Sequence, residues 1–142
     1  MATLIALWLP PVLWMAAIFW FSSADFGADR TGEFLLPLLR SLLPWATDAQ
    51  LQLVHRGIRH TAHVVEYGIL ALLWFRALIR GVALRARAAG GLAVAVAAAW
   101  ACVDEWHQST IASRTGSIWD VLLDGAGALA ATLVVLTVRR LR

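Results

Sequence analysis

Apolar residues gather into four long runs along the chain, and polar residues collect between the runs and at a few positions inside them. Each run is long enough to cross the roughly 30 Å hydrocarbon core of a bilayer as an α-helix. The pattern predicts membrane-spanning helices at about residues 4–21, 61–79, 88–106 and 118–138. We expect an all-α fold, an integral membrane four-helix bundle, in which residues 1–142 form a single transmembrane domain.

The first run contains Pro10 and Pro11, which we expect to kink its helix. A cleaved signal peptide is the competing interpretation of an apolar segment at this place. The start Met-Ala-Thr carries no arginine or lysine, however, and the run is long for the apolar part of a signal peptide. We therefore interpret it as a retained span.

The connection between the first two spans, residues 22–60, is too long to be structureless in so small a protein. Its leucine-rich part, residues 33–44, is apolar but too short to span, so we expect an interfacial helical segment in this first outer loop. Beyond that segment, Thr47 and Gln50 have the spacing of a capping box. This spacing predicts a helix that begins there and runs into the second span.

The composition supports a membrane protein. Apolar residues make up 61% of the chain and the mean hydropathy is +0.72, more than a soluble domain of this length can bury. The net charge of +3 is carried by arginine, since the chain has no lysine, and membrane topology explains it without a nucleic-acid partner. Cys102 is the only cysteine and lies in an apolar run, where we interpret it as a packing residue.

Arginine is unevenly divided between the two sides of the predicted membrane. The connection from the second to the third span and the C-terminal tail hold arginine and no acidic residue: Arg76, Arg80, Arg85, Arg87, Arg139, Arg140 and Arg142. Segments rich in arginine stay on the cytoplasmic side of a membrane. We therefore expect both termini to be cytoplasmic and the other two loops to face outward.

Polar residues recur at helical spacing where the second span begins. The residues Arg59, His60, His63, Glu66 and Tyr67 recur at helical offsets of three, four and seven, so they share one side of the helix. Such a face must contact protein or water, because ionisable groups are costly against lipid.

The third and fourth spans also carry polar residues on one face. Asp104 and Gln108 are i, i+4 neighbours, with Glu105 and His107 on either side and Trp106 pointing away as an interface anchor. In the fourth span, one helix face carries Asp120, Asp124, Gly127 and Ala131. The small residues permit close helix contact, and we expect all three polar faces to meet at the outer end of the bundle.

Two interpretations of these residues remain open. The carboxylates of Asp104, Glu105, Asp120 and Asp124 either pair with Arg59 and Arg114 as internal polar packing, or the whole set forms a site. In a site, the candidate acid and base groups, if the protein is an enzyme, are His63, Tyr67, Asp104 and Glu105. The candidate ligand-binding residues are Arg59, Glu66, His107, Gln108, Arg114, Asp120 and Asp124.

The chemistry of this set favours an anionic ligand. A guanidinium such as that of Arg114 suits a phosphate, which suggests a lipid-linked or headgroup substrate reached from the outer leaflet. No HExxH or bundle-type ExxH motif occurs, so we predict no metal site. The sequence leaves the question of a cofactor open, and the serines lack the surroundings of a nucleophile elbow.

Short motifs at the ends of the spans resemble those of the VanZ-like family. They are Phe21-Ser22-Ser23, Arg59-x-x-x-His63-x-x-x-Tyr67, Asp104-Glu105-x-His107-Gln108, Arg114, Asp120 and Gly125. The resemblance covers nearly the whole chain. Two residues depart from the family pattern, since relatives commonly have lysine at the position of Arg59 and asparagine at that of Asp124.

The resemblance implies a small protein of the bacterial cytoplasmic membrane and cell envelope. One member of that family is associated with lowered susceptibility to the glycopeptide antibiotic teicoplanin. Beside the lipid bilayer, the expected partners are a lipid-linked cell-wall precursor or a glycopeptide. Two alternatives to a ligand-modifying protein stay open: a module that only binds or shields a ligand, and a small proton-coupled exporter that uses Glu66.

Overall fold

The chain folds into α-helices joined by short connections. The computed structural model describes residues 2–23, 26–111 and 116–141, and within them it contains five helices and no strand. The helices are α1 (Ala2–Phe21), α2 (Ala28–Leu42), α3 (Asp48–Gly81), α4 (Ala86–Ser109) and α5 (Ile118–Arg140). The all-α fold is confirmed.

Four of the helices, α1, α3, α4 and α5, are long and apolar enough to cross a membrane. The prediction of a four-span membrane bundle is therefore confirmed, with helix ends that differ from the predicted spans by at most three residues except at the start of α3. α1 continues through Pro10 and Pro11. α2 forms the helical segment predicted in the first outer loop.

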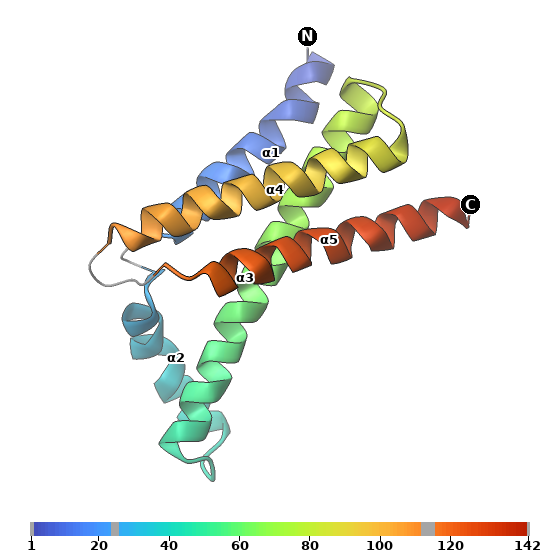
Figure 1. Ribbon diagram of the computed structural model, residues 1–142. Coiled ribbons are helices and arrows are strands. Elements are labelled where there is room, and N and C mark those ends of the chain that lie inside the picture. The colour runs from blue at the N-terminus through green and yellow to red at the C-terminus, as the bar shows by residue number, and fades with distance from the viewer. Residues whose placement is uncertain (1, 24–25, 112–115, 142) are drawn as a thin grey trace.

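The helix α3 is much longer than the second predicted span, residues 61–79. Its 34 residues extend over about 51 Å at 1.5 Å per residue. The predicted capping box is present: the Thr47 side chain accepts a hydrogen bond from Gln50 N at 3.3 Å, and Gln50 Oε1 accepts one from Thr47 N at 2.8 Å. The first part of α3 therefore extends beyond the bundle, where α2 packs against it (Figure 1).

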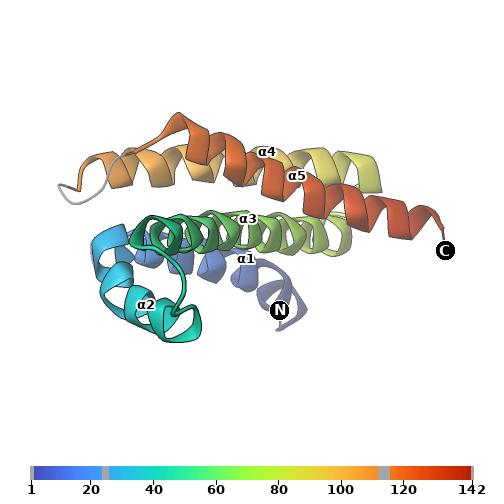
Figure 2. The same cartoon turned by 90° about the horizontal axis from the view of Figure 1, so that it is seen from below.

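The helices of the bundle form two layers (Figure 2). α4 and α5 make one layer, and α3 with α1 makes the other, while α2 lies beside the N-terminal half of α3. α5 crosses α3 at Gly127, where a Cβ atom would lie 2.5 Å from the backbone oxygen of Val64. Only glycine permits this approach of the two backbones.

Small residues also bring α4 close to its neighbours. Ala89, Ala93, Ala97 and Ala101 recur at every fourth position and are all fully buried. Larger side chains fill the space around this alanine face, among them Ile18, Tyr67 and Leu70. The outer surface carries exposed leucine and valine, which is what lipid-facing helices show.

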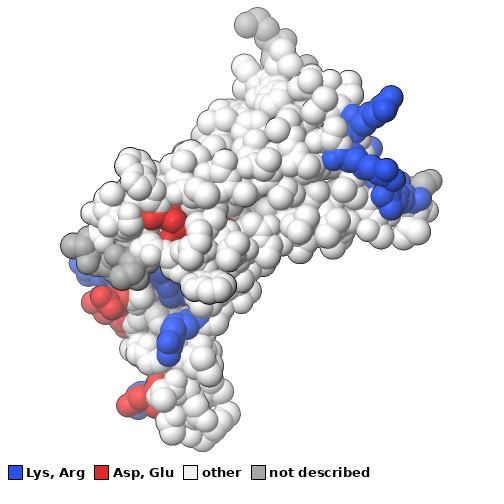
Figure 3. All heavy atoms as spheres, viewed as in Figure 1, with Lys and Arg blue, Asp and Glu red and all other residues white. Residues whose placement is uncertain are grey.

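The two ends of the bundle differ in charge (Figure 3). At the end where α3 and α5 finish and α4 begins, arginine side chains gather without acidic ones; they are Arg80, Arg85, Arg87, Arg139 and Arg140. We call this the arginine end. At the opposite end, where α1 and α4 finish and α5 begins, acidic and basic residues mix, and we call this the polar end.

Candidate functional site

The carboxylate of Asp104 lies buried at the polar end with only 1% of the residue exposed. Ser22, which follows α1, donates a hydrogen bond from its hydroxyl to Asp104 Oδ1. Gln108 Nε2 donates to Asp104 Oδ2 at 3.0 Å and to the Ser22 hydroxyl at 3.2 Å. These bonds close a small network that ties the end of α1 to α4.

Tyr67 reaches the same network from α3. The residue is fully buried, and its hydroxyl lies beside Asp104 without completing a hydrogen bond of ordinary geometry to any described residue. Its ring packs in the apolar core with Ile18 and Leu70. Tyr67 therefore carries a polar atom from the core to the edge of the Asp104 network.

His63 and Asp124 face each other across the contact between α3 and α5. His63 Nδ1 lies 3.3 Å from Asp124 Oδ1, and no part of Asp124 is exposed. Among the described residues, neither carboxylate oxygen of Asp124 has a hydrogen bond of good geometry. The imidazole of His63 thus faces a buried carboxylate that forms no other ion pair among the described residues.

Glu105 lies on a different side of α4 and holds the start of α5. Its Oε2 accepts a hydrogen bond of 2.6 Å from the backbone nitrogen of Ser117, the N-cap residue of α5. Gly116 lets the chain pass close by, since a Cβ there would be 2.8 Å from the backbone oxygen of Glu105. Asp120, in the first turn of α5, is half-buried.

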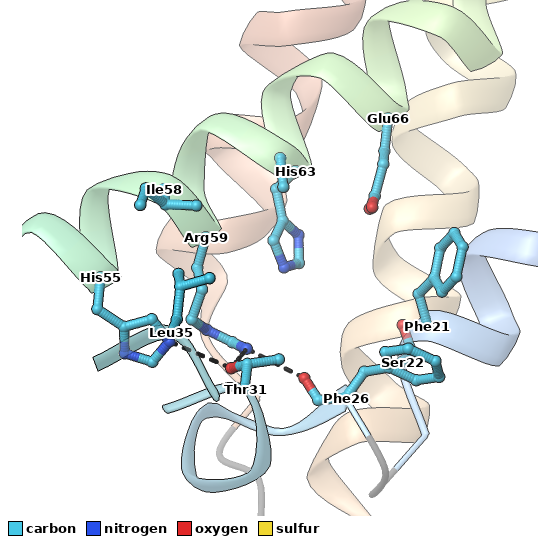
Figure 4. Close-up of a pocket in the computed structure, with 11 residues that line it drawn as sticks. Phe21, Ser22, Phe26, Thr31, Leu35, His55, Ile58, Arg59, His63 and Glu66 are labelled. Carbon is cyan, nitrogen blue, oxygen red and sulfur yellow. Dashed lines mark hydrogen bonds between the residues drawn. The ribbon is translucent and has the colours of Figure 1, made fainter. Parts of the chain in front are cut away.

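A cavity of about 300 Å³ lies between the end of α1, α2 and α3 (Figure 4), and we call it the inner cavity. Its walls combine apolar and polar side chains. The lining residues are Phe21, Ser22, Phe26, Thr31, Leu35, His55, Ile58, Arg59, Ala62, His63 and Glu66. In Figure 4 the imidazole of His63 points from α3 into the middle of this cavity.

Arg59 belongs to α3, and its guanidinium reaches toward α2 at the edge of the inner cavity. Its Nη1 donates to the backbone oxygen of Phe26 at 3.1 Å and to the hydroxyl of Thr31 at 3.2 Å. The same hydroxyl lies 3.2 Å from His55 Nε2. Arg59 forms no ion pair with a carboxylate among the residues that the structure describes, so the pairing considered as internal packing is not seen for this arginine.

The structure divides the residues predicted for one site among several places. Arg59, His63 and Glu66 line the inner cavity, and Asp124 lies behind His63. Asp104 and Gln108 belong to the buried network with Ser22, and Tyr67 lies at its edge. His107 stacks on Phe19 of α1, with ring centroids 4.1 Å apart, and does not line the inner cavity. Arg114 lies outside the described residues.

Three residues of this end were not among the predicted site residues. Ser22 was noted only as part of a motif, and Thr31 was not noted at all. His55 precedes Arg59 by four positions and His63 by eight, so helical spacing alone could have placed it on the same face of α3. Nothing comparable marks Thr31, because its position depends on how α2 docks.

The groups that could bind a metal ion are dispersed. Among residues 2–23, 26–111 and 116–141, no three His, Cys, Asp or Glu side chains gather as the ligands of one ion would.

The match to known proteins concerns nearly the whole chain. The family model of VanZ/LLP1 matches residues 7–139. The chain belongs to the VanZ/LLP1 family. Comparison with curated proteins and with solved structures found no match.

Membership in VanZ/LLP1 agrees with the resemblance drawn from the short motifs. The fold places these motifs together at the polar end: Ser22 bonds to Asp104, and Arg59 and His63 line one cavity. As a member of VanZ/LLP1 with four apolar helices, the chain is a multi-pass membrane protein.

Proposed function

We propose that this VanZ/LLP1 protein binds the anionic head of a lipid-linked, cell-wall-related ligand in the inner cavity, and that His63 exchanges a proton with it. The observation that carries the proposal is the position of His63. Its ring points into the cavity on one side and faces the buried Asp124 on the other. A proton can thus pass between a ligand and a group that water does not reach.

Arg59 is the proposed anchor for the anion. Its guanidinium reaches neutral acceptors, the Phe26 carbonyl and the Thr31 hydroxyl, and no described carboxylate. A guanidinium offers five donors, so one nitrogen bound to these acceptors leaves others for a phosphate or carboxylate. The positive charge beside the cavity is therefore available to a ligand.

The remaining walls suit an apolar portion of the ligand. Phe21, Phe26, Leu35 and Ile58 line the cavity from three elements. A volume of about 300 Å³ is at the lower limit for small-molecule sites. This volume favours part of a lipid-linked precursor over a whole glycopeptide. A role in teicoplanin susceptibility is therefore only a hypothesis for this protein, which drug-susceptibility assays of the cloned gene would test.

The buried network has a supporting role in this proposal. Asp104, with Ser22 and Gln108, fixes the end of α1 that forms one wall of the inner cavity. Glu105 fixes the start of α5, which carries Asp124. Asp104, Glu105 and Tyr67 thus shift from candidate catalytic residues to residues that position the site.

The polar side chains lie at one end of the bundle, whereas a transport path would need them near its middle. This favours ligand binding over proton-coupled export. We further propose that the polar end faces outward from the bacterial cytoplasmic membrane, because the arginine end should remain in the cytoplasm. A C-terminal alkaline phosphatase fusion should then be inactive, because the C-terminus lies in the cytoplasm. An active fusion would show that the protein has the opposite orientation.

The proposed ligand can be sought by mass spectrometry of lipids that co-purify with the protein. Wild type should be enriched in one class of anionic lipid relative to the surrounding membrane, and His63→Ala and Arg59→Gln should lose that enrichment. His60→Asn is the matched control, since His60 is exposed on the same helix and outside the cavity lining. An identical lipid set in all four proteins would refute the proposal.

The conservative variant His63→Gln distinguishes a protein that only binds the lipid from an enzyme that modifies it. A protein that only binds should retain most of the enriched lipid in this variant. An enzyme should accumulate the unmodified form of the lipid, because loss of a general acid or base slows turnover by about 10² to 10⁴-fold while binding persists.

A further inference from the structure

A second cavity lies along a different face of α2, and we call it the outer groove. It encloses about 620 Å³ between α2 and the N-terminal half of α3. The inner cavity uses Thr31 and Leu35 of α2, whereas the outer groove uses the neighbouring face of that helix. The two cavities share His55 and Arg59 of α3 as a common wall.

The two walls of the outer groove carry opposite charge. α2 contributes the carboxylates of Asp29 and Glu33, and α3 contributes the guanidinium groups of Arg56 and Arg59. Among the described residues, no ion pair crosses the groove, and Glu33 pairs with Arg30 of its own helix, at 3.7 Å. If these charges served to hold α2 against α3, the acidic residues of α2 would pair directly with the arginines of α3. The described residues show no such pair, so the two walls stay separated by the groove.

The surface of α2 indicates the depth of the outer groove in the membrane. Phe34, Leu38 and Leu42 recur at every fourth position of α2, and Trp45 lies in the turn that follows the helix. All four side chains are exposed, Trp45 to 78%. An exposed apolar stripe on a short helix, with a tryptophan at its end, is typical of a helix that lies in the membrane interface. The groove beside it is then at the level of the lipid headgroups.

We infer that the outer groove binds a zwitterionic headgroup, with its ammonium toward Asp29 and Glu33 and its phosphate or carboxylate toward Arg56. Such a group completes both walls with charge-assisted hydrogen bonds. An anion alone would leave the acidic wall unpaired and would be repelled by it. This inference does not depend on the function proposed for the inner cavity.

Native mass spectrometry of the purified protein tests this with two short-chain lipids. Phosphatidylethanolamine carries the ammonium and the phosphate, and phosphatidylglycerol carries the phosphate alone. Wild type should bind the first about tenfold more tightly than the second. In the double variant Asp29→Asn, Glu33→Gln the preference should disappear, and Arg56→Gln should weaken both lipids.

The controls use charges of the same region that do not line the outer groove. Asp48→Asn and Arg40→Gln should keep the wild-type preference, since both residues are exposed and outside the lining. Free phosphoethanolamine separates the sources of the group. If it displaces the lipid, the groove binds the zwitterion from either source, and if it does not, the groove binds it as a lipid headgroup.

Equal binding of the two lipids by wild type would overturn the inference, and so would a preference that survives in the double variant or is lost in Asp48→Asn. None of these variants changes His63 or Arg59. Failure here therefore leaves the proposal for the inner cavity standing, and failure of that proposal leaves this one.

Discussion

Asp104 of α4 and Asp124 of α5 are both buried at the polar end, yet they have very different surroundings. Asp104 accepts hydrogen bonds from Ser22 and Gln108, one to each carboxylate oxygen. Neither oxygen of Asp124 has a hydrogen bond of good geometry among the described residues, and the ring of His63 lies 3.3 Å from one of them. Buried polar groups in a stable core are normally satisfied. The first carboxylate therefore looks structural, whereas the second depends on a group that also faces a cavity.

The largest effect is expected for Asp104→Ala. The substitution removes the acceptor of the buried Ser22 hydroxyl and one of the two acceptors of Gln108 Nε2, which should lower the free energy of unfolding by about 2 to 4 kcal/mol. Thermal unfolding in detergent measures it. Asp48→Ala is the control, because Asp48 is exposed and its ion pair with Arg40 is worth at most about 1 kcal/mol. Equal unfolding temperatures in both variants would contradict a structural role.

Gly127→Ala should act on the Asp124 side alone. The added methyl group would meet the backbone of Val64 and push α5 from α3, at a cost of about 1 to 3 kcal/mol. Because Val64 adjoins His63, the contact between His63 and Asp124 should lengthen as well. Gly125→Ala meets nothing within 4 Å and should be neutral or stabilise the helix by up to about 1 kcal/mol. Thermal unfolding measures both changes in stability. If both variants were destabilised, or neither, the close crossing of α5 over α3 at Gly127 would be contradicted.

Ser22→Ala removes one of the two donors to Asp104 and should cost about 1 to 2 kcal/mol. The neighbouring Ser23→Ala changes a side chain outside the cavity lining and outside that network, and it should cost less. Chemical unfolding in mixed micelles compares the two. Should Ser23→Ala prove the more damaging, the network around Asp104 would not be what holds the end of α1.

The smallest effect on stability is expected for Asp124→Asn. Asparagine keeps a hydrogen-bonding group beside His63 and removes a charge that is costly to bury, so the two changes offset to within about 1 kcal/mol. Binding should suffer more than stability, because His63 loses its carboxylate. Thermal unfolding together with lipid co-purification measures both. Unfolding as severe as that of Asp104→Ala would abolish the contrast between the two carboxylates.

Most of the fold could be predicted from the sequence because membrane spans and helix caps are local signals. Apolar length predicted α1, α4 and α5, and the spacing of Thr47 and Gln50 predicted where α3 begins. The structure confirms that this helix runs into the second span, since α3 is one continuous helix of 34 residues. The N-terminal half of this long helix extends beyond the bundle, and α2 packs against it there.

The site was predicted less completely, because its residues are brought together by tertiary packing. Helical spacing put Arg59 and His63 on one face, and both line the inner cavity. It could not show that Arg59 turns toward Thr31 of α2, or that His107 stacks on Phe19, since both partners lie on other helices. Periodicity within a helix says which residues share a face, and only docking decides what they meet.

Site-specific photo-crosslinking tests most directly the central claim that a ligand occupies the cavity in front of His63. A photoreactive residue at Ile58 would line the inner cavity, and one at Val65 would sit on the exposed surface of the same helix. We predict that Ile58 captures one class of anionic lipid, that Arg59→Gln lowers this adduct severalfold, and that His60→Asn does not. Identical adducts at the two positions, or an adduct at Ile58 that is unchanged by Arg59→Gln, would contradict the account.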